Sequence, residues 1–361
     1  MTTNIKIHDH SSWMFKERPY YFFGPCSAES LEQMRQTAAG IKKHYDKVIF
    51  RAGIWKPRTR PNSFEGFGEK ALDWLCAIKE EFGFKITTEV ANPYHLEKCL
   101  EAGVDIVWLG ARTTVNPFAV QALADALKGV DIPVFVKNPI NPDLPLWIGA
   151  LERINGAGIK QLGAIHRGFH LSENGPYRNY PRWDLAVQLK AHFPNLPVIC
   201  DVSHISGDPR LIPHVAQKSI DLAMDGLMVE AHFNPKMALS DAKQQMTPDA
   251  LQRIMEHLTP KSKSSENPEF TNKVEVLRAK IDQLDEELLE QIAIRMDVAK
   301  EIGSYKNNNR VTVLQISRWK QILDQNLKNG KSLGLSESFI HEFLNVIHDE
   351  SIRQQTDEAN D

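Results

Sequence analysis

Four cations lie within ten positions of one another, directly after the short apolar run Val48–Phe50. They are Arg51, Lys56, Arg58 and Arg60. The whole sequence carries a formal net charge of −3, so this cluster is a local excess of positive charge. Guanidinium and ammonium groups held near a strand end by a proline-stiffened loop are typical ligands of phosphates and carboxylates. The pattern predicts an anion-binding loop, with a basic surface loop as the alternative.

Length and composition indicate a globular protein of two domains. The chain has 361 residues, of which 42% are apolar and 25% are charged. Its nearly balanced charge disfavours nucleic-acid and membrane-surface partners. Four cysteines without a CxxC pair are typical of a reducing compartment, and the first residues lack the apolar segment of a signal peptide. No apolar run reaches the length of a membrane span, so we expect a cytoplasmic protein.

One polar segment divides the chain. Residues 259–272 contain two prolines and three serines, and no proline follows them. This composition is typical of a linker. The sequence therefore predicts a first domain at 1–258, a linker at 259–271 and a second domain at 272–361.

The first domain contains eight short apolar runs, mostly separated by helical patterns such as Leu31–His44 and Phe67–Phe82. Alternation of strand and helix predicts a parallel sheet, and eight units in about 250 residues fit a closed (β/α)8 barrel. An open doubly wound sheet is the alternative. The runs are Tyr21–Phe23, Val48–Phe50, Lys85–Thr88, Ile106–Leu109, Val134–Val136, Lys160–Ala164, Val198–Cys200 and Leu227–Val229.

A polar residue follows each run, where a barrel carries its chemistry. The first, seventh and eighth strands of a closed barrel are neighbours, so Cys26, His204 and Glu230, with Asp241 soon after, predict a site for one divalent metal. A thiolate and an imidazole favour Mn, Fe, Co or Zn over Mg. Each residue alone also fits a structural role. In chain order the residues after the runs are Cys26, Arg51 with Lys56, Glu89, Arg112, Lys137, Arg167, His204 and Glu230.

Five of these residues are cations, and together they predict a small substrate that carries a phosphate and a carboxylate. They are Arg51, Lys56, Arg112, Lys137 and Arg167. A metal beside them would polarise a carbonyl of a second substrate. A surface salt bridge is the alternative for any one of them alone.

Six motifs in this order resemble 3-deoxy-D-arabino-heptulosonate 7-phosphate (DAHP) synthases of type I, beta subclass, over roughly residues 18–258. The resemblance implies condensation of phosphoenolpyruvate with erythrose 4-phosphate at the entry to the shikimate pathway. It implies that Cys26, His204, Glu230 and Asp241 bind the metal, that the five cations bind phosphoenolpyruvate, and that Arg58 and Thr59 bind the phosphate of erythrose 4-phosphate. The motifs are Gly-Pro-Cys-Ser at 24–27, Lys-Pro-Arg-Thr at 56–59, Gly-Ala-Arg at 110–112, Asp-Val-Ser-His at 201–204, Val-Glu-Ala-His at 229–232 and Ala-Leu-Ser-Asp-Ala-Lys-Gln at 238–244.

Two positions depart from the family pattern, because Arg60 stands where serine is usual and Val202 where proline is usual. The related 3-deoxy-manno-octulosonate 8-phosphate synthases share the barrel and phosphoenolpyruvate. They have Lys-Ala-Asn-Arg-Ser in place of the Lys-Pro-Arg-Thr at 56–59, which disfavours that family here. A barrel aldolase with another substrate is a further rival, disfavoured by the five cations.

The second domain carries a long apolar stripe with helical spacing at 273–303, followed by helical patterns at about Ile316–Lys328 and Ser336–Gln354. Three helices cannot bury this stripe alone, so we expect self-association as a homodimer. A plain dimerisation module is the alternative. Arg295 and Lys306 are 11 positions apart and share a face of one helix. Arg278 is about 25 Å from Arg295 along the axis and joins them only from a second, antiparallel chain.

This domain resembles the all-helical chorismate mutases over about residues 272–356. The resemblance implies that Arg278 from the partner chain and Arg295 bind the two carboxylates of chorismate, that Lys306 and Gln355 bind the ether oxygen, and that Arg318 and Ser351 line the site. Trp319 and Gln315 stand where the family often has acidic residues. The motifs are Leu-Arg-Ala-Lys-Ile-Asp-Gln-Leu-Asp at 277–285, Arg295-Met, Ile-Gly-Ser-Tyr-Lys at 302–306 and Asp-Glu-Ser-Ile-Arg-Gln-Gln at 349–355.

Together the two resemblances imply a bifunctional shikimate-pathway enzyme, a barrel synthase fused to a dimeric three-helix mutase. The fusion suggests feedback inhibition of the synthase by chorismate or prephenate bound at the mutase domain. The alternative is a synthase whose C-terminal domain binds ligand and dimerises without catalysis, which Trp319 and Gln315 favour.

Overall fold

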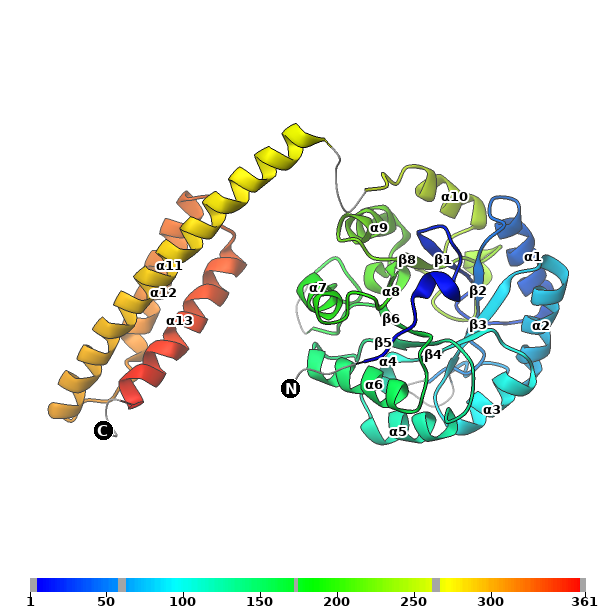
Figure 1. The fold of residues 1–361 in the computed structure, drawn as a ribbon, viewed down its shortest axis with the longest axis horizontal. Helices are drawn as coiled ribbons and strands as arrows, with labels where there is room; N and C mark the ends of the chain where they lie inside the picture. The colour runs from blue at the N-terminus through cyan, green and yellow to red at the C-terminus, as the bar shows by residue number, and fades with distance from the viewer. Residues whose placement is uncertain (1–4, 58–62, 172–174, 262–266, 358–361) are drawn as a thin grey trace. The chain divides into compact units, whose positions relative to one another are not determined.

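The computed structural model describes residues 5–57, 63–171, 175–261 and 267–357. The chain divides into two compact units, Met1–Lys263 and Ser264–Asp361. The first unit is a barrel and the second consists of helices α11 to α13 (Figure 1). Among the described residues, no helix is long and apolar enough to cross a membrane.

The strands of the first unit form a closed parallel barrel in the order β1 to β8, which confirms the predicted (β/α)8 fold over the open sheet. Closure is made by β1 and β8, where Gly24 lies opposite Glu230. Each predicted apolar run contributes to one strand. The strands are β1 Tyr20–Gly24, β2 Ile49–Arg51, β3 Lys85–Val90, β4 Ile106–Leu109, β5 Val134–Lys137, β6 Leu162–His166, β7 Val198–Asp201 and β8 Gly226–Glu230.

Helices cover the outside of the barrel, and side-chain caps fix several of their first turns. Ser30 accepts from the Gln33 amide at the start of α1, and Asn92 accepts from the His95 amide at the start of α3. The helices are α1 Leu31–Lys42, α2 Lys70–Phe82, α3 Pro93–Glu101, α4 Ala111–Thr114, α5 Pro117–Ala126, α6 Leu144–Gly156, α7 Trp183–His192, α8 Val202–Ser206, α9 Ile212–Asp221 and α10 Pro248–Glu256, with 3-10 turns at η1 His10–Ser12, η2 Pro209–Leu211 and η3 Pro235–Met237.

The barrel has two apolar layers because successive side chains of a strand point to opposite faces. Phe22 belongs to the inner cluster and Phe23 to the layer between strands and helices. Trp13 from the N-terminal segment joins the inner cluster, and its ring lies 5.8 Å from that of Phe135. Apolar side chains thus fill the barrel interior, while polar residues gather at the carboxyl ends of the strands.

The second unit consists of α11 Pro268–Asn308, α12 Ile316–Ser332 and α13 Glu337–Asp357. Helix α11 begins inside the range predicted as linker, where Asn267 accepts from the amides of Glu269 and Phe270. Met296 and Ala299 of α11 are buried, as are Ile340 and Ile347 of α13. Gly303 allows close packing in this unit, because a Cβ there would lie 2.9 Å from the Gln355 Cα.

Candidate active sites

A cavity of about 580 Å³ opens in the barrel unit among the residues predicted to do chemistry. Three of them, Arg51, Lys137 and Glu230, are the last residues of their strands, and His204 lies on α8 rather than on a strand. Glu230 is fully buried beside the cavity. The predicted residues that line the cavity are Cys26, Arg51, Lys56, Glu89, Arg112, Lys137, Arg167, His204 and Asp241.

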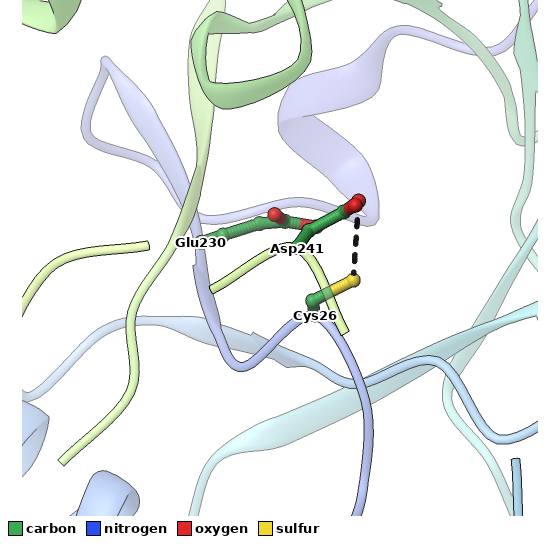
Figure 2. A group of neighbouring side chains, drawn as sticks. All are labelled: Cys26, Glu230 and Asp241. Carbon is green, nitrogen blue, oxygen red and sulfur yellow. Dashed lines mark hydrogen bonds between the residues drawn. The ribbon is translucent and has the colours of Figure 1, made fainter. Parts of the chain in front are cut away.

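Cys26, Glu230 and Asp241 bring three potential metal ligands together (Figure 2). One ligand atom from each lies within 4.8 Å of the others, and the Cys26 thiol donates to Asp241 Oδ2 at 3.6 Å. His204 completes the predicted set, because its Nε2 lies 3.8 Å from Glu230 Oε1 and 4.0 Å from Asp241 Oδ2. Asp241 has a φ of +47°, a conformation that non-glycine residues adopt only when surrounding contacts hold them.

Each of the three potential ligands Cys26, Glu230 and Asp241 also contacts a cation. Arg51 Nη1 donates to Glu230 Oε1 at 2.7 Å, and Lys56 Nζ donates to Cys26 Sγ at 3.2 Å. The guanidinium of Arg178 lies 3.1 Å from Asp241 Oδ2. The cluster is therefore charge-compensated by the protein itself, and a metal ion would take over part of this compensation.

Asp201 orients the histidine and was missed by the sequence reasoning, which noted it only as part of a motif. His204 Nδ1 lies 2.9 Å from Asp201 Oδ2, which leaves Nε2 facing Glu230 and Asp241. Lys137 Nζ donates to the same carboxylate oxygen at 2.8 Å. A carboxylate on the second ring nitrogen of a metal-binding histidine fixes its tautomer and raises its basicity.

Charge and burial act in opposite directions on the acids of the cluster. Burial, reinforced by Glu230, raises the pKa of the Cys26 thiol to about 11. Burial also opposes ionisation of Asp241, but His204 and Arg178 outweigh it and lower the pKa of that carboxyl to about 2. For Glu230 the effect of burial is likewise outweighed by His204 and Arg51, so its pKa is lowered. Both carboxylates are ready ligands, whereas Cys26 must lose a proton to bind a metal.

The four side chains fit a divalent transition ion. A thiolate, an imidazole and two carboxylates provide one soft, one intermediate and two hard donors, and all four converge at the same end of the barrel. The left-handed conformation of Asp241 is the observation that most favours a ligand role, because strained backbone is retained where it serves a site.

All five predicted substrate-binding cations line the cavity, and Lys56 among them contacts Cys26. Arg51 and Lys137 lie over the Trp108 ring, at 5.3 Å and 5.5 Å from its centroid. Arg112 donates to the Pro57 carbonyl. Burial lowers the pKa of the Arg167 guanidinium to about 10, so it still carries its charge at neutral pH. The cavity wall is therefore strongly cationic, as an anionic substrate requires.

Arg58, Thr59 and Arg60 lie outside the described residues, so the contacts of Arg58 and Thr59 with the second phosphate stay predictions. The cavity lining adds Arg178 and Asn179, which the sequence reasoning missed. Their position between β6 and α7 in a (β/α)8 pattern was the available signal, because such loops line the open end of a barrel.

The second unit brings together two pairs of predicted residues between α11 and α13. Arg295 Nη1 donates to Ser351 Oγ, and Lys306 Nζ donates to Gln355 Oε1 at 3.1 Å. Lys306 Nζ also donates to the Val313 carbonyl at 2.6 Å. Because α11 is unbroken from Pro268 to Asn308, Arg295 and Lys306 face the same neighbour, as their spacing predicted.

The other predicted residues of this unit take no part in these two pairs. Arg278 is exposed, and Arg318 on α12 is exposed with Gln321 as its acceptor at 3.5 Å. The ring of Trp319 stacks on His348 of α13, with centroids 3.9 Å apart and planes at 12°. An aromatic pair thus occupies the place where the sequence comparison had expected an acidic side chain.

Known proteins share both parts of this arrangement. The model of the DAHP synthetase I family matches residues 15–266, and that of chorismate mutase type II matches residues 277–356. A phospho-2-dehydro-3-deoxyheptonate aldolase of Thermotoga maritima is 30% identical over 236 residues, which cover 65% of this chain and 67% of that protein. A 2-dehydro-3-deoxyphosphooctonate aldolase of Helicobacter pylori is 29% identical over 265 residues, covering 66% of this chain and 93% of the relative.

Solved structures agree with the sequence matches. The crystal structure of a DAHP synthase from Thermotoga maritima superposes with a TM-score of 0.59 at 27% identity, covering 66% of this chain and 67% of that one. The family match covers most of the chain and coincides with the barrel, while the mutase match coincides with the three-helix unit. The chain therefore belongs to the DAHP synthetase I family, and it joins a barrel of that family to a chorismate mutase type II domain in one bifunctional enzyme of the shikimate pathway.

Proposed function

We propose that the barrel condenses phosphoenolpyruvate with erythrose 4-phosphate to give DAHP and phosphate. The observation that carries this proposal is one cavity lined by both the cationic set and the metal-ligand cluster. We further propose the domain boundaries given by the sequence, with the barrel at 1–258, a linker at 259–271 and the mutase domain at 272–361.

The cations hold two mutually repelling anions in reacting distance. Arg51, Lys56, Arg112, Lys137 and Arg167 bind the phosphate and carboxylate of phosphoenolpyruvate, and Arg58 with Thr59 binds the phosphate of the aldose. Carbon 3 of phosphoenolpyruvate then attacks the aldehyde carbon, water adds at carbon 2, and phosphate leaves. Holding both reactants in one geometry removes much of the entropic barrier, and fixed positive charge stabilises the charge that develops.

Cys26, His204, Glu230 and Asp241 would hold one divalent ion such as Mn²⁺, Fe²⁺, Co²⁺ or Zn²⁺. When bound, the ion polarises the aldehyde carbonyl. Asp201 keeps the His204 ring oriented through its Nδ1, at 2.9 Å. Arg51 and Lys56 contact ligand atoms of Glu230 and Cys26, so they lie where the two substrates must meet.

A direct assay of the intact chain tests the barrel activity. Phosphate release from phosphoenolpyruvate is expected only when erythrose 4-phosphate is also present. It should stop when a chelator removes the metal and return when Mn²⁺ is added. Release with arabinose 5-phosphate in place of erythrose 4-phosphate would instead assign the octulosonate reaction of the related family. Release with neither sugar phosphate would contradict the proposal.

The helical domain, we propose, rearranges chorismate to prephenate. Arg295, with Arg278 of the partner subunit, binds the two carboxylates, and Lys306 with Gln355 places positive charge and a hydrogen bond at the ether oxygen. Arg318 and Ser351 line the same site. The reaction is unimolecular, so holding a reactive conformer and stabilising the breaking bond suffice. The contacts that support this proposal are Arg295 to Ser351 and Lys306 to Gln355.

Half of the apolar stripe on α11 supports homodimerisation. In its C-terminal part Met296 and Ala299 are buried within the chain, although Ile302 is 46% exposed. Its N-terminal part is uncovered, since Leu284 is 48% exposed and Leu288 is 56% exposed. Leu277 and Ile281 continue the same stripe at 51% and 55% exposure. A stripe of this length is typical of a helix that pairs with a second copy, which would also bring Arg278 of the partner subunit to the site.

The double variant Leu284→Glu with Leu288→Glu is expected to be monomeric, because two charges would be buried in the paired stripe. Its mutase kcat/KM should fall about 100-fold, the equivalent of one lost charged hydrogen-bonding partner. Sedimentation velocity and the mutase assay measure both effects. Leu333→Glu is the control. It introduces the same charge at a leucine that is 78% exposed and lies outside α11, so this variant should remain dimeric. A dimeric double variant with full mutase activity would disprove this interface.

We also propose that chorismate or prephenate bound at the helical domain inhibits the barrel. The chain carries both a site for a downstream metabolite and the site of an early step, and differential binding to two states of one protein is what allosteric coupling requires. Arg295 is the residue through which this proposal is tested, because it belongs to the helical domain alone.

A further inference from the structure

We infer that Asn179 is a positioning residue that links the substrate-anion side of the barrel cavity to its metal-ligand side. This inference rests on the proposed synthase function and assigns to Asn179 a role that touches neither substrate nor metal directly. It acts through two other residues, Arg167 and His204.

The side chain of Asn179 has both polar groups engaged and is only 6% exposed. Its Oδ1 accepts from Arg167 Nη1 at 2.7 Å, and its Nδ2 donates to the carbonyl of His204 at 2.6 Å. One amide thus bridges a proposed phosphoenolpyruvate ligand and a proposed metal ligand. Asparagine is the shortest uncharged side chain whose acceptor and donor are separate atoms, so it can hold two partners on its two sides.

The backbone around Asn179 is anchored on both sides. Its amide donates to the Ile205 carbonyl of α8 at 3.2 Å, which ties the segment to the turn that carries His204. Phe169 and Tyr180 exchange backbone hydrogen bonds of 2.7 Å and 2.8 Å, which tie it to the chain just after β6. Gly168 makes this approach possible, because a Cβ there would lie 2.8 Å from the Asn179 carbonyl oxygen and its φ is +74°. The backbone that carries the Asn179 side chain is therefore held in place on both sides.

The preceding residue, Arg178, supports the surroundings of two other proposed metal ligands, Asp241 and Glu230. The guanidinium of Arg178 lies 3.1 Å from Asp241 Oδ2, and it donates to Gln244 Oε1. Gln244 Nε2 in turn donates to Glu230 Oε2 at 2.6 Å. The dipeptide at 178–179 therefore supports the surroundings of three proposed ligands, His204, Asp241 and Glu230. Asn179 is the member that also reaches an anion-binding residue.

Arg167 depends on this bridge for its orientation. Its backbone amide donates to Asn138 Oδ1 at 2.7 Å, which fixes the main chain but not the guanidinium. Its side chain is half-buried, and among the described residues Asn179 Oδ1 accepts the hydrogen bond of that guanidinium. Loss of the acceptor frees a long side chain to adopt other rotamers, which weakens its bidentate grip on an oxyanion.

The test uses the full-length chain and two ligands measured separately. Calorimetry gives the dissociation constant of Mn²⁺ alone and that of phosphoenolpyruvate in the Mn²⁺-loaded protein. Asn179→Ala is expected to weaken both by about tenfold, the lower end of what loss of an outer-shell partner costs a metal site. Asn195→Ala replaces an exposed asparagine in the loop before β7 and is expected to change neither.

A double-mutant cycle with Arg167→Ala separates positioning from general loosening of the fold. In the Arg167→Ala background, Asn179→Ala should weaken phosphoenolpyruvate binding no further, because the residue through which it acts is gone. It should still weaken Mn²⁺ binding about tenfold, because the His204 branch is intact. Equal losses of phosphoenolpyruvate affinity in both backgrounds would overturn the inference, as would unchanged Mn²⁺ binding in the single variant. A wild-type chain that binds neither ligand would refute the proposed function itself.

Discussion

Replacing Cys26 with alanine is expected to abolish metal binding at the barrel and to lower the synthase kcat by at least about 10³-fold. A Lewis acid contributes several kcal/mol to the stabilisation of developing charge, and each ~1.4 kcal/mol is a factor of ten in rate. Cys26 is the soft donor of the cluster, so the remaining histidine and carboxylates would lose selectivity for a transition ion. Mutase activity should stay at the wild-type level, because the helical domain holds none of these ligands.

The number of protons released on metal binding tests whether the Cys26 thiol is a ligand. The pKa of Cys26 is raised to about 11, so the side chain is a thiol at pH 7 and must release a proton when a metal binds. Metal affinity of the wild type should therefore rise with pH between 6 and 9, by up to about tenfold per unit. Calorimetry of Mn²⁺ binding in buffers of different ionisation enthalpy measures the released proton.

A matched control is available in the same barrel. Cys76→Ala removes a half-buried thiol on α2 that donates to the Ala102 carbonyl, so it should leave metal binding and synthase activity unchanged. Full activity of the Cys26 variant, or proton release that persists in it, would show that the metal is bound elsewhere. Synthase activity and proton release together thus decide whether the metal binds at this cluster or elsewhere.

Replacing Arg295 with alanine is expected to lower the mutase kcat/KM by about 10²–10³-fold, the loss seen when one preorganised charge-stabilising donor is removed. Arg295 of α11 donates to Ser351 Oγ of α13, and Lys306 of α11 donates to Gln355 Oε1 of the same α13. Burial lowers the pKa of this guanidinium without removing its charge. The variant should therefore lose its grip on a substrate carboxylate rather than lose its fold.

The same variant tests feedback. Synthase activity without effector should be unchanged, whereas inhibition by chorismate or prephenate should disappear or need at least tenfold higher concentrations. Arg353→Ala is the control, because Arg353 pairs with Glu350 on the exposed side of α13. Retained inhibition in the Arg295 variant would place the effector site elsewhere. A wild-type chain without mutase activity but with intact inhibition would favour the non-catalytic, ligand-binding alternative, to which the Trp319 and His348 stack gives a physical basis.

The sequence by itself determined the elements and the types of chemistry. Strand and helix patterns depend on side chains a few positions apart, which is why all the apolar runs became strands and the proline-free tail became long helices. Residues directly after strands of a closed parallel barrel must converge, so Cys26, His204 and Glu230 were predictable neighbours. In the same way, the spacing of Arg295 and Lys306 placed them on one face of α11.

Only the tertiary structure decided which groups pair with one another. Cys26 and Asp241 are separated by 215 positions, and their contact depends on how the loop after β8 folds back with Asp241 at a positive φ. No local pattern assigns Asp201 to His204 or Asn179 to Arg167. Each pair lies within one connection that follows a strand, and its contact depends on how that connection folds back over the open end of the barrel. Packing likewise decides that Met296 and Ala299 of the α11 stripe are buried while Leu284 and Leu288 stay exposed. Periodicity fixes which residues share a face, whereas packing fixes what that face meets.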